Sequence, residues 1–270
     1  MRWPLKRHVK KLKRYQYEKY AVLCNLAYSR VLKHTRYGFA PKGQRIVYNR
    51  FGQPMIRVLW KNDHDEVIVV IKGSHNPQDW LLNLHLWQRR AHCLKLNYRV
   101  HSGYLQQITQ PSIAKHTPTP YPLSVHQALS DILQPLLENG KRVTFTGHSS
   151  GGAIACILAD ALEKQRAKSV KRVVTFGQPA FGGFMMKKQY SLSHKTYRIC
   201  CDLDIVTFLP PLPGVYLHVG KQLWLYNGKI YENTPTLIRL GRSVASWVVR
   251  PFSYHLMSKY IRNKDFFDER

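Results

Sequence analysis

Short apolar runs alternate with helical patterns along the middle of this chain. Residues 125–137 and 152–165 carry apolar residues at helical spacing. The apolar, β-branched runs between and around them are typical of buried strands, and they cover residues 56–60, 67–71, 143–146, 173–176 and 197–200. This alternation predicts an α/β fold with a mostly parallel central sheet and helices on both faces.

The two ends of the chain add further elements. Apolar residues recur at helical spacing over 15–34, which predicts an amphipathic helix packed on the body of the protein. Residues 216–226 and 229–231 flank Asn227-Gly228, a pair suited to a tight hairpin turn. Four prolines in 111–122 predict a loop. Without repeats, we interpret the chain as a basic arm over 1–14 followed by one domain over 15–270.

Charge is the unusual property of the composition. The 270 residues, 44% of them apolar, are enough for one sizeable core, but 42 Lys and Arg against 15 Asp and Glu give a net charge of +27. Such a charge favours polyanions or anionic surfaces as partners. The first twenty residues hold eight of the basic residues. This arm is compatible with contact to an anionic membrane and equally with a solvated tail.

The sequence also gives expectations about location and cofactors. It contains no apolar run long enough to span a bilayer and no secretory signal, so we predict a cytoplasmic protein, with peripheral membrane contact if the arm binds lipid. The five cysteines are odd in number, and the neighbours Cys200 and Cys201 could pair with each other only in a strained bridge, which predicts free thiols in a reducing compartment. No His/Cys cluster has zinc spacing, so we predict neither a metal site nor a cofactor.

One motif carries specific chemistry. Gly147-His148-Ser149-Ser150-Gly151 follows an apolar strand and precedes an Ala-rich helix. A nucleophilic serine at a sharp strand-to-helix turn needs glycines on both sides, because side chains there would clash. The helix N-terminus can then supply backbone N–H groups to an oxyanion. The alternative is a glycine-rich turn with a bystander serine, but the position between strand and helix favours a nucleophile.

A serine nucleophile requires a histidine base and a carboxylate to orient that base. Asp202 and Asp204 follow a predicted strand, and on an extended backbone both would point to the same side, so spacing does not separate them. Among the histidines after Ser149, His218 lies in a predicted strand and is better explained as a packed residue. His255 follows a loop and precedes a short helix, a suitable place for a base.

The loop after residues 67–71 is a candidate second oxyanion donor. Gly73 allows close backbone approach, and Ser74 could donate together with the backbone N–H of Ser150. Just downstream, residues 80–87 place apolar side chains on one helical face, within a segment (75–90) that could be a lid. A core helix would show the same periodicity, and both interpretations stay open.

Taken together, these stretches resemble the class 3 lipase family over residues 67–255. The resemblance implies Ser149 as nucleophile, Asp204 as acid, His255 as base and Ser74 with Ser150 at the oxyanion hole, with 80–87 at the lid position. Ser150 departs from the leucine usual after the nucleophile. The resemblance rests on Val69-Val70-Ile71-Lys72-Gly73-Ser74 with Asp79-Trp80, Val100-His101-Ser102-Gly103-Tyr104, 143–152, Thr175-Phe176-Gly177-Gln178-Pro179, Asp204-Ile205-Val206 with Leu209-Pro210-Pro211, and Tyr254-His255.

We therefore predict serine-dependent hydrolysis of carboxylic esters in lipids through an acyl-enzyme, without a cofactor. One alternative is a phospholipase or lysophospholipase, whose anionic substrates would suit the positive charge. The alternative from another class is a basic membrane-binding or nucleic-acid-binding protein on a catalytically retired hydrolase scaffold. Nucleic acid is the weaker partner because charge is its only signal. The acyl chain length and the oligomeric state are not predicted.

Overall fold

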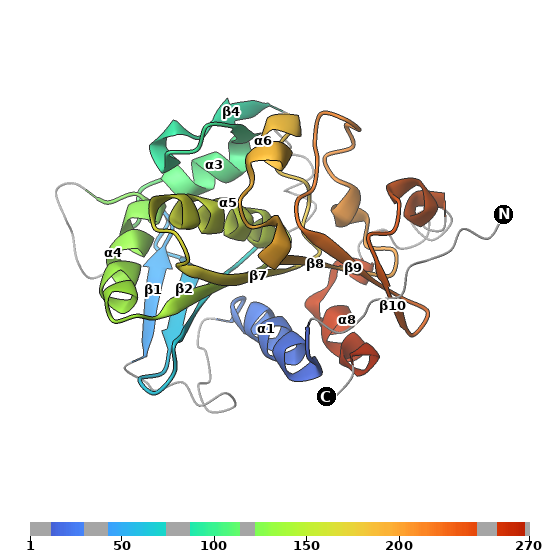
Figure 1. Ribbon diagram of the computed structural model, residues 1–270, viewed down its shortest axis with the longest axis horizontal. Coiled ribbons are helices and arrows are strands. Elements are labelled where there is room, and N and C mark those ends of the chain that lie inside the picture. The colour runs from blue at the N-terminus through green and yellow to red at the C-terminus, as the bar shows by residue number, and fades with distance from the viewer. Residues whose placement is uncertain (1–11, 30–42, 74–86, 114–121, 242–252, 268–270) are drawn as a thin grey trace.

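The computed structural model describes residues 12–29, 43–73, 87–113, 122–241 and 253–267 (Figure 1). Its centre is an eight-stranded sheet in the order β1-β2-β3-β6-β7-β8-β9-β10. The strands are β1 (Gln44–Tyr48), β2 (Pro54–Trp60), β3 (Glu66–Ile71), β6 (Arg142–His148), β7 (Val170–Phe176), β8 (Thr196–Cys201), β9 (Lys221–Tyr226) and β10 (Lys229–Glu232).

Five neighbouring strands of this sheet are parallel. Strands β3, β6, β7, β8 and β9 pair in parallel, while β1 and β2 at one edge and β10 at the other are antiparallel. The predicted mostly parallel sheet is confirmed. All carboxyl ends of the five parallel strands therefore meet at one edge, where ligand and active sites of such sheets form.

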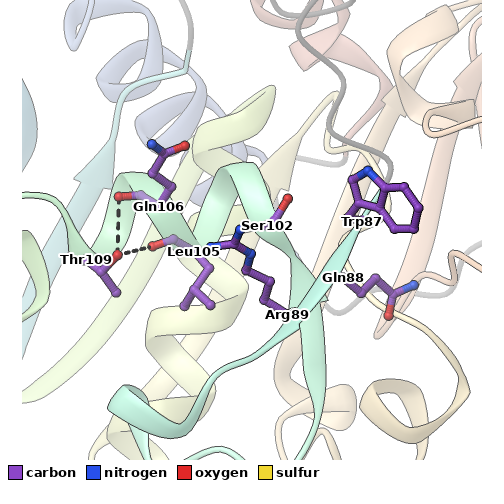
Figure 2. Close-up of a pocket in the computed structure, with 7 residues that line it drawn as sticks. All are labelled: Trp87, Gln88, Arg89, Ser102, Leu105, Gln106 and Thr109. Atoms are coloured by element: carbon purple, nitrogen blue, oxygen red, sulfur yellow. Dashed lines mark hydrogen bonds between the residues drawn. The ribbon is translucent and has the colours of Figure 1, made fainter.

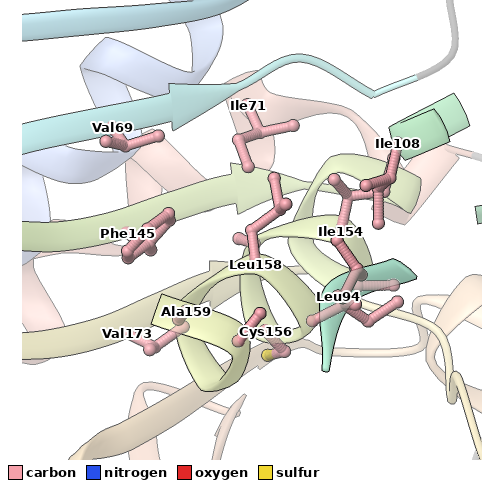
Figure 3. Packing of buried hydrophobic residues seen from close by; sticks show 14 of the residues in the cluster. Val69, Ile71, Leu94, Ile108, Phe145, Ile154, Cys156, Leu158, Ala159 and Val173 are labelled. Atoms are coloured by element: carbon pink, nitrogen blue, oxygen red, sulfur yellow. The ribbon is translucent and has the colours of Figure 1, made fainter. Parts of the chain in front are cut away.

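Helices cover both faces of the sheet, as predicted. On β3, Val67, Val69 and Ile71 face one apolar cluster with α3, α4 and α5, while Ile68 and Val70 face a second cluster with α1 and α8. Figure 3 shows Ile154 and Leu158 of α5 packed over β3 and β6. The helices are α1 (Arg14–Leu26), α3 (Ser102–Thr109), α4 (Val125–Glu138), α5 (Ser150–Gln165), α6 (Phe184–Gln189) and α8 (Met257–Arg262).

A second, two-stranded sheet lies beside α3 and α6 at one end of the molecule (Figure 1). It consists of β4 (Gln88–Arg90) and β5 (Arg99–His101), and the short bridge between Val100 and Gly182 ties it to the segment before α6. Short 3-10 helices complete the described chain: η2 (His92–Leu94), η3 (Ser193–Lys195), η4 (Ile205–Phe208), η5 (Ser253–His255) and η6 (Asn263–Phe266).

Two predicted boundaries are wrong. The first helix ends at Leu26, well before residue 34, and a turn follows. Residues 216–220 are not part of the hairpin strand, because Gly220 adopts a φ of +69° beside Thr196 and the strand begins only at Lys221. The hairpin turn itself is confirmed, with φ of 47° at Asn227 and 68° at Gly228.

Several predictions concern residues outside the described ranges. These are most of the basic arm (1–11), Ser74, most of the 80–87 helix and most of the proline-rich loop (114–121). All five cysteines lie inside the described ranges and are free thiols, as predicted. In the described part of the chain, no helix has the length and apolar character that crossing a membrane would require.

Candidate active site

Ser149 occupies the sharp turn between β6 and α5. Its backbone has φ 58° and ψ −133°, and its N–H donates to the carbonyl of Phe176 at 2.9 Å. A side chain at Gly147 would place Cβ 2.3 Å from the carbonyl oxygen of Gly151, and one at Gly151 would place Cβ 2.4 Å from that of Ile71. Both glycines are therefore required for this turn, which has the strained geometry of a nucleophile elbow.

Asp204 and His255 meet at the carboxyl edge of the sheet. Asp204 follows β8 and caps η4, and His255 ends η5, 51 residues later. The Nδ1 of His255 lies 3.0 Å from both carboxylate oxygens of Asp204. Both side chains are buried, with 0% and 1% of their surface exposed, so the pair is shielded from solvent. A carboxylate in this position fixes the imidazole with its proton on Nδ1.

Hydrogen bonds keep Asp204 ionised despite its burial. Burial alone would raise the pKa of Asp204, but the electrostatic attraction of His255 and the hydrogen bonds from His255 and Tyr260 together hold the pKa below its ordinary value. The Tyr260 hydroxyl donates to Oδ2, and the backbone N–H of Val206 donates to Oδ1 at 3.0 Å. The carboxylate is thus negative and fully hydrogen-bonded at neutral pH.

The structure separates Asp202 from Asp204. Asp202 has a φ of 38°, so the backbone leaves the strand at this residue, and the expectation that both carboxylates point to the same side is wrong. Burial raises the pKa of the Asp202 carboxyl, whose side chain contacts the thiol of Cys201. Of the two carboxylates, only that of Asp204 bonds a histidine in the described structure.

His148, within the motif that contains Ser149, packs against His255. Its ring stacks on that of His255 with centroids 4.4 Å apart, and its Nε2 donates to the carbonyl of His255 at 2.7 Å. The Tyr28 hydroxyl lies 2.8 Å from its Nδ1. Burial, with the nearby His255, lowers the pKa of His148 to about 3, so this ring is neutral at pH 7.

The position of Ser149 relative to His255 follows from these contacts. Ser149 directly follows His148, whose ring stacks on that of His255, so the backbone brings the serine into the neighbourhood of the histidine. The Nε2 of His255 is buried and makes no hydrogen bond within the described residues. No bond from Ser149 to His255 is therefore present there, and in hydrolases without substrate this bond is often long. The free Nε2 lone pair is the acceptor that a serine proton requires.

The predicted oxyanion loop lies beside the serine. A Cβ built on Gly73 would lie 3.0 Å from the Cβ of Ser149, so the β3 loop closely approaches the nucleophile. Ser150 is buried at the first position of α5, directly after Ser149. Ser74 lies outside the described residues, so its role stays a prediction.

The other histidines after Ser149 have no catalytic contacts in the described structure. His218 is half-buried and bonds the carbonyl of Thr207 at 3.0 Å, so it is a packed residue as predicted, although it lies before the strand. His194 is exposed in η3. Sequence reasoning missed Tyr28, Tyr260 and the supporting role of His148, because each depends on a contact between residues far apart in the chain.

The chain is similar in sequence to known lipases and to a phospholipase. The secreted mono- and diacylglycerol lipase 1 of Fusarium solani is 26% identical over 174 residues, which are 64% of this chain and 48% of that protein. Phospholipase A1-Igamma2 of Arabidopsis thaliana is 24% identical over 208 residues, 69% of this chain and 36% of that protein. The chain therefore spans less than half the length of these curated relatives.

Solved structures show the same fold. The Lip2 lipase of Yarrowia lipolytica superposes with a TM-score of 0.66 at 18% identity, covering 99% of this chain and 97% of that one. The neighbouring structures are lipases of the α/β-hydrolase fold. The family described as Lipase (class 3) matches residues 68–214, more than half of the sequence. This chain belongs to the class 3 lipase family.

Proposed function

We propose that this protein hydrolyses carboxylic esters of lipids, with Ser149 as the nucleophile, His255 as the base and Asp204 as the acid. The observation that carries this proposal is the buried Asp204–His255 pair next to the strained turn of Ser149. Membership of the class 3 lipase family and the names of the relatives support the same chemistry.

The geometry supports a two-step reaction. Ser149 Oγ attacks the ester carbonyl while His255 Nε2 takes its proton, and the proton then passes to the leaving alcohol. The resulting acyl-enzyme is released when water, activated by the same imidazole, attacks the acyl carbon. Asp204 stays ionised and stabilises the imidazolium formed in each step. The backbone N–H of Ser150 and the β3 loop near Gly73 are placed to stabilise the oxyanion.

The test compares the wild type with Ser149→Ala on a series of esters of increasing acyl length. We expect the wild type to release fatty acid, and Ser149→Ala to lose at least about 10³-fold in kcat, because the nucleophile supplies the covalent route. Labelling by a fluorophosphonate should follow the same pattern. Equal hydrolysis by the two proteins would refute the assignment of Ser149.

The alternative of a retired scaffold makes the opposite prediction. A catalytically inactive protein would resist the fluorophosphonate while still binding polyanions in a salt-sensitive way. In contrast, the unoccupied Nε2 of His255 beside Ser149 favours an active enzyme.

Phospholipids are the second candidate substrates. The net charge of +27 favours anionic head groups, and one relative is a phospholipase A1. Release of fatty acid from neutral diacylglycerol and from phosphatidylglycerol, each compared between wild type and Ser149→Ala, distinguishes the two classes of substrate.

A further inference from the structure

Acidic residues are scarce in the segments around the carboxyl edge of the sheet. Residues 80–130, 164–201 and 205–231 contain no Asp or Glu. These segments include the loop that follows β7 and, from residue 205 onward, the loop that follows β8, as well as β4, β5, α3 and α6. Among the residues that the structure describes, the acidic side chains near this edge are Asp202, which is half-buried, and Asp204, which is buried.

At the opposite edge of the sheet, acidic side chains pair with some of the basic ones. Asp65 lies just before β3 and pairs with Arg142 at 3.1 Å and Lys171 at 3.2 Å, near the amino ends of β6 and β7. Glu163, near the end of α5, pairs with Lys195 at 3.4 Å. Acidic partners therefore neutralise part of the basic charge at this edge, whereas few acidic side chains lie near the carboxyl edge.

Five exposed basic side chains near the carboxyl edge take no part in any ion pair among the described residues. They lie on two elements that contact each other, the β4–β5 sheet and α6. Arg90 and Arg99 are directly opposite each other in the sheet, which places like charges together without a counter-ion. The five residues are Arg89, Arg90, Arg99, Lys187 and Lys188.

Exposed apolar side chains share this surface. Large apolar residues rarely gather on the surface of a soluble domain without a binding role. Here Trp87 is 77% exposed, Phe184 68%, Met185 51% and Val215 50%. We call these four residues and the five basic ones the carboxyl-edge patch.

Contacts between the loops show that the apolar residues are neighbours. The Gln88 side chain, next to Trp87, donates to the carbonyl of Val215 at 2.9 Å. The backbone of Gly183, next to Phe184, lies against the same carbonyl, since a Cβ there would be 3.1 Å from it. The three loops thus meet at one place.

A hollow of about 630 Å³ lies between β4 and α3 within this region. Figure 2 shows Trp87 at one side of the hollow and Arg89 extending from β4 toward Leu105 and Ser102 of α3. The lining combines one guanidinium and polar side chains with apolar surface. That combination suits an amphiphile with an anionic head group.

We propose that the carboxyl-edge patch docks the protein onto anionic lipid surfaces, with its apolar side chains inserted and its basic side chains on the head groups. The inference rests on the proposed function, because docking there would present the lipid to the same sheet edge that holds Ser149. Nucleic acid would match the charge alone, whereas the exposed Trp87, Phe184, Met185 and Val215 favour a membrane.

The test is sedimentation of the Ser149→Ala protein with vesicles, so that hydrolysis does not alter the lipid. We compare phosphatidylcholine vesicles with vesicles of equal parts phosphatidylcholine and phosphatidylglycerol. Each basic residue near an anionic surface contributes about fivefold, corresponding to about 1 kcal/mol. Replacing both Lys187 and Lys188 by Glu should therefore lower the partition coefficient on anionic vesicles at least about 25-fold.

A matched control places the same charge change at the other edge. Lys61→Glu with Lys168→Glu alters side chains that precede β3 and β7, and it should reduce binding far less, because these residues lie away from the docked surface. Phe184→Ser with Met185→Ser should weaken binding while leaving the net charge unchanged. Unfolding temperatures of all variants show that the fold is retained.

Three results would overturn the proposal: equal binding to both kinds of vesicle, equal losses for the two charge pairs, or binding to duplex DNA without binding to anionic vesicles. Hydrolysis of a soluble short-chain ester by the wild type separates this proposal from the proposed function. An inactive protein that still binds through the patch would contradict only the enzymatic proposal, and an active protein that does not bind would contradict only the docking.

Discussion

The Tyr260 hydroxyl donates a hydrogen bond to the same carboxylate of Asp204 that orients His255. It also accepts a hydrogen bond from the backbone N–H of Cys201 at 3.2 Å, so it links the end of β8 to the acid. Tyr260 is fully buried on α8, five residues after His255. Tyr260 therefore connects α8, which follows His255, to β8, which precedes Asp204.

Removing this hydroxyl should affect both activity and stability. Tyr260→Phe should lower kcat about tenfold, because the carboxylate that orients His255 loses a positioning contact. It should also lower the free energy of unfolding by about 1.5–3 kcal/mol at neutral pH, the usual contribution of a hydrogen bond to a charged group. Steady-state kinetics and urea unfolding measure the two effects.

The pH dependence gives a control for the Tyr260 prediction. Asp204 has a folded pKa below its ordinary value of 3.8, so its ionised form stabilises the fold above that value, and this stabilisation is lost as pH falls through the folded pKa. The stability difference between wild type and Tyr260→Phe should therefore shrink in acid. If the difference in stability between the two proteins stays constant while Asp204 becomes protonated, the proposed contact is contradicted.

The choice between the two carboxylates can be tested directly. Asp204→Asn preserves the size of the side chain but favours the wrong imidazole tautomer, and we expect kcat to fall about 10⁴-fold. Asp202→Asn is the matched control, because its side chain contacts Cys201 and not His255. It should retain kcat within about threefold, as expected for a residue without a catalytic contact. Comparable losses in both variants would refute the assignment of Asp204.

The sequence predicted the elements that have strong apolar runs. Residues 143–146, 173–176 and 197–200 all lie within β6, β7 and β8. The small β4–β5 sheet was missed because Gln88, Arg89 and Arg90 have no apolar pattern. Short polar strands of this kind form through pairing with neighbours, and their own side chains give little signal.

The candidate site was predictable only in part, for a similar reason. Ser149 was identified from its local motif, because the steric requirement for glycine acts within a few residues. The contacts of Tyr260 with Asp204, His148 with His255 and Tyr28 with His148 join residues 56, 107 and 120 positions apart. No local pattern encodes such contacts, since they depend on how the two faces of the sheet are covered.

His148 should make the stability of the protein depend on pH. In the fold its pKa is lowered from 6.5 to about 3, so between these values the unfolded chain binds a proton that the folded protein does not. Stability must then fall as pH decreases, by up to about 1.4 kcal/mol per pH unit for this group. His148→Gln removes the group, and its free energy of unfolding should fall less steeply between about pH 6 and pH 4.

The prediction for His148→Gln concerns how steeply the free energy of unfolding changes with pH, and not its value at one pH. His148→Gln also loses the stacking on His255 and two hydrogen bonds, so it should be less stable than the wild type at pH 7. Urea unfolding at several pH values separates the two effects. Parallel curves for the two proteins would show that His148 titrates normally in the fold.

The turn that holds Ser149 should not tolerate a methyl group at Gly147. A Cβ there would lie 2.3 Å from the carbonyl oxygen of Gly151, an atom of the backbone that cannot move aside without displacing α5. We expect Gly147→Ala to lower the free energy of unfolding by about 3 kcal/mol, in the range of overpacking in a rigid interior, and to displace Ser149 from its position.

Gly241→Ala is the control, since no heavy atom lies within 4 Å of the added Cβ, and it should leave both the stability and the position of Ser149 unchanged. Fluorophosphonate labelling and thermal unfolding measure the two consequences, and a stable, fully labelled Gly147→Ala protein would show that the turn is not constrained as described.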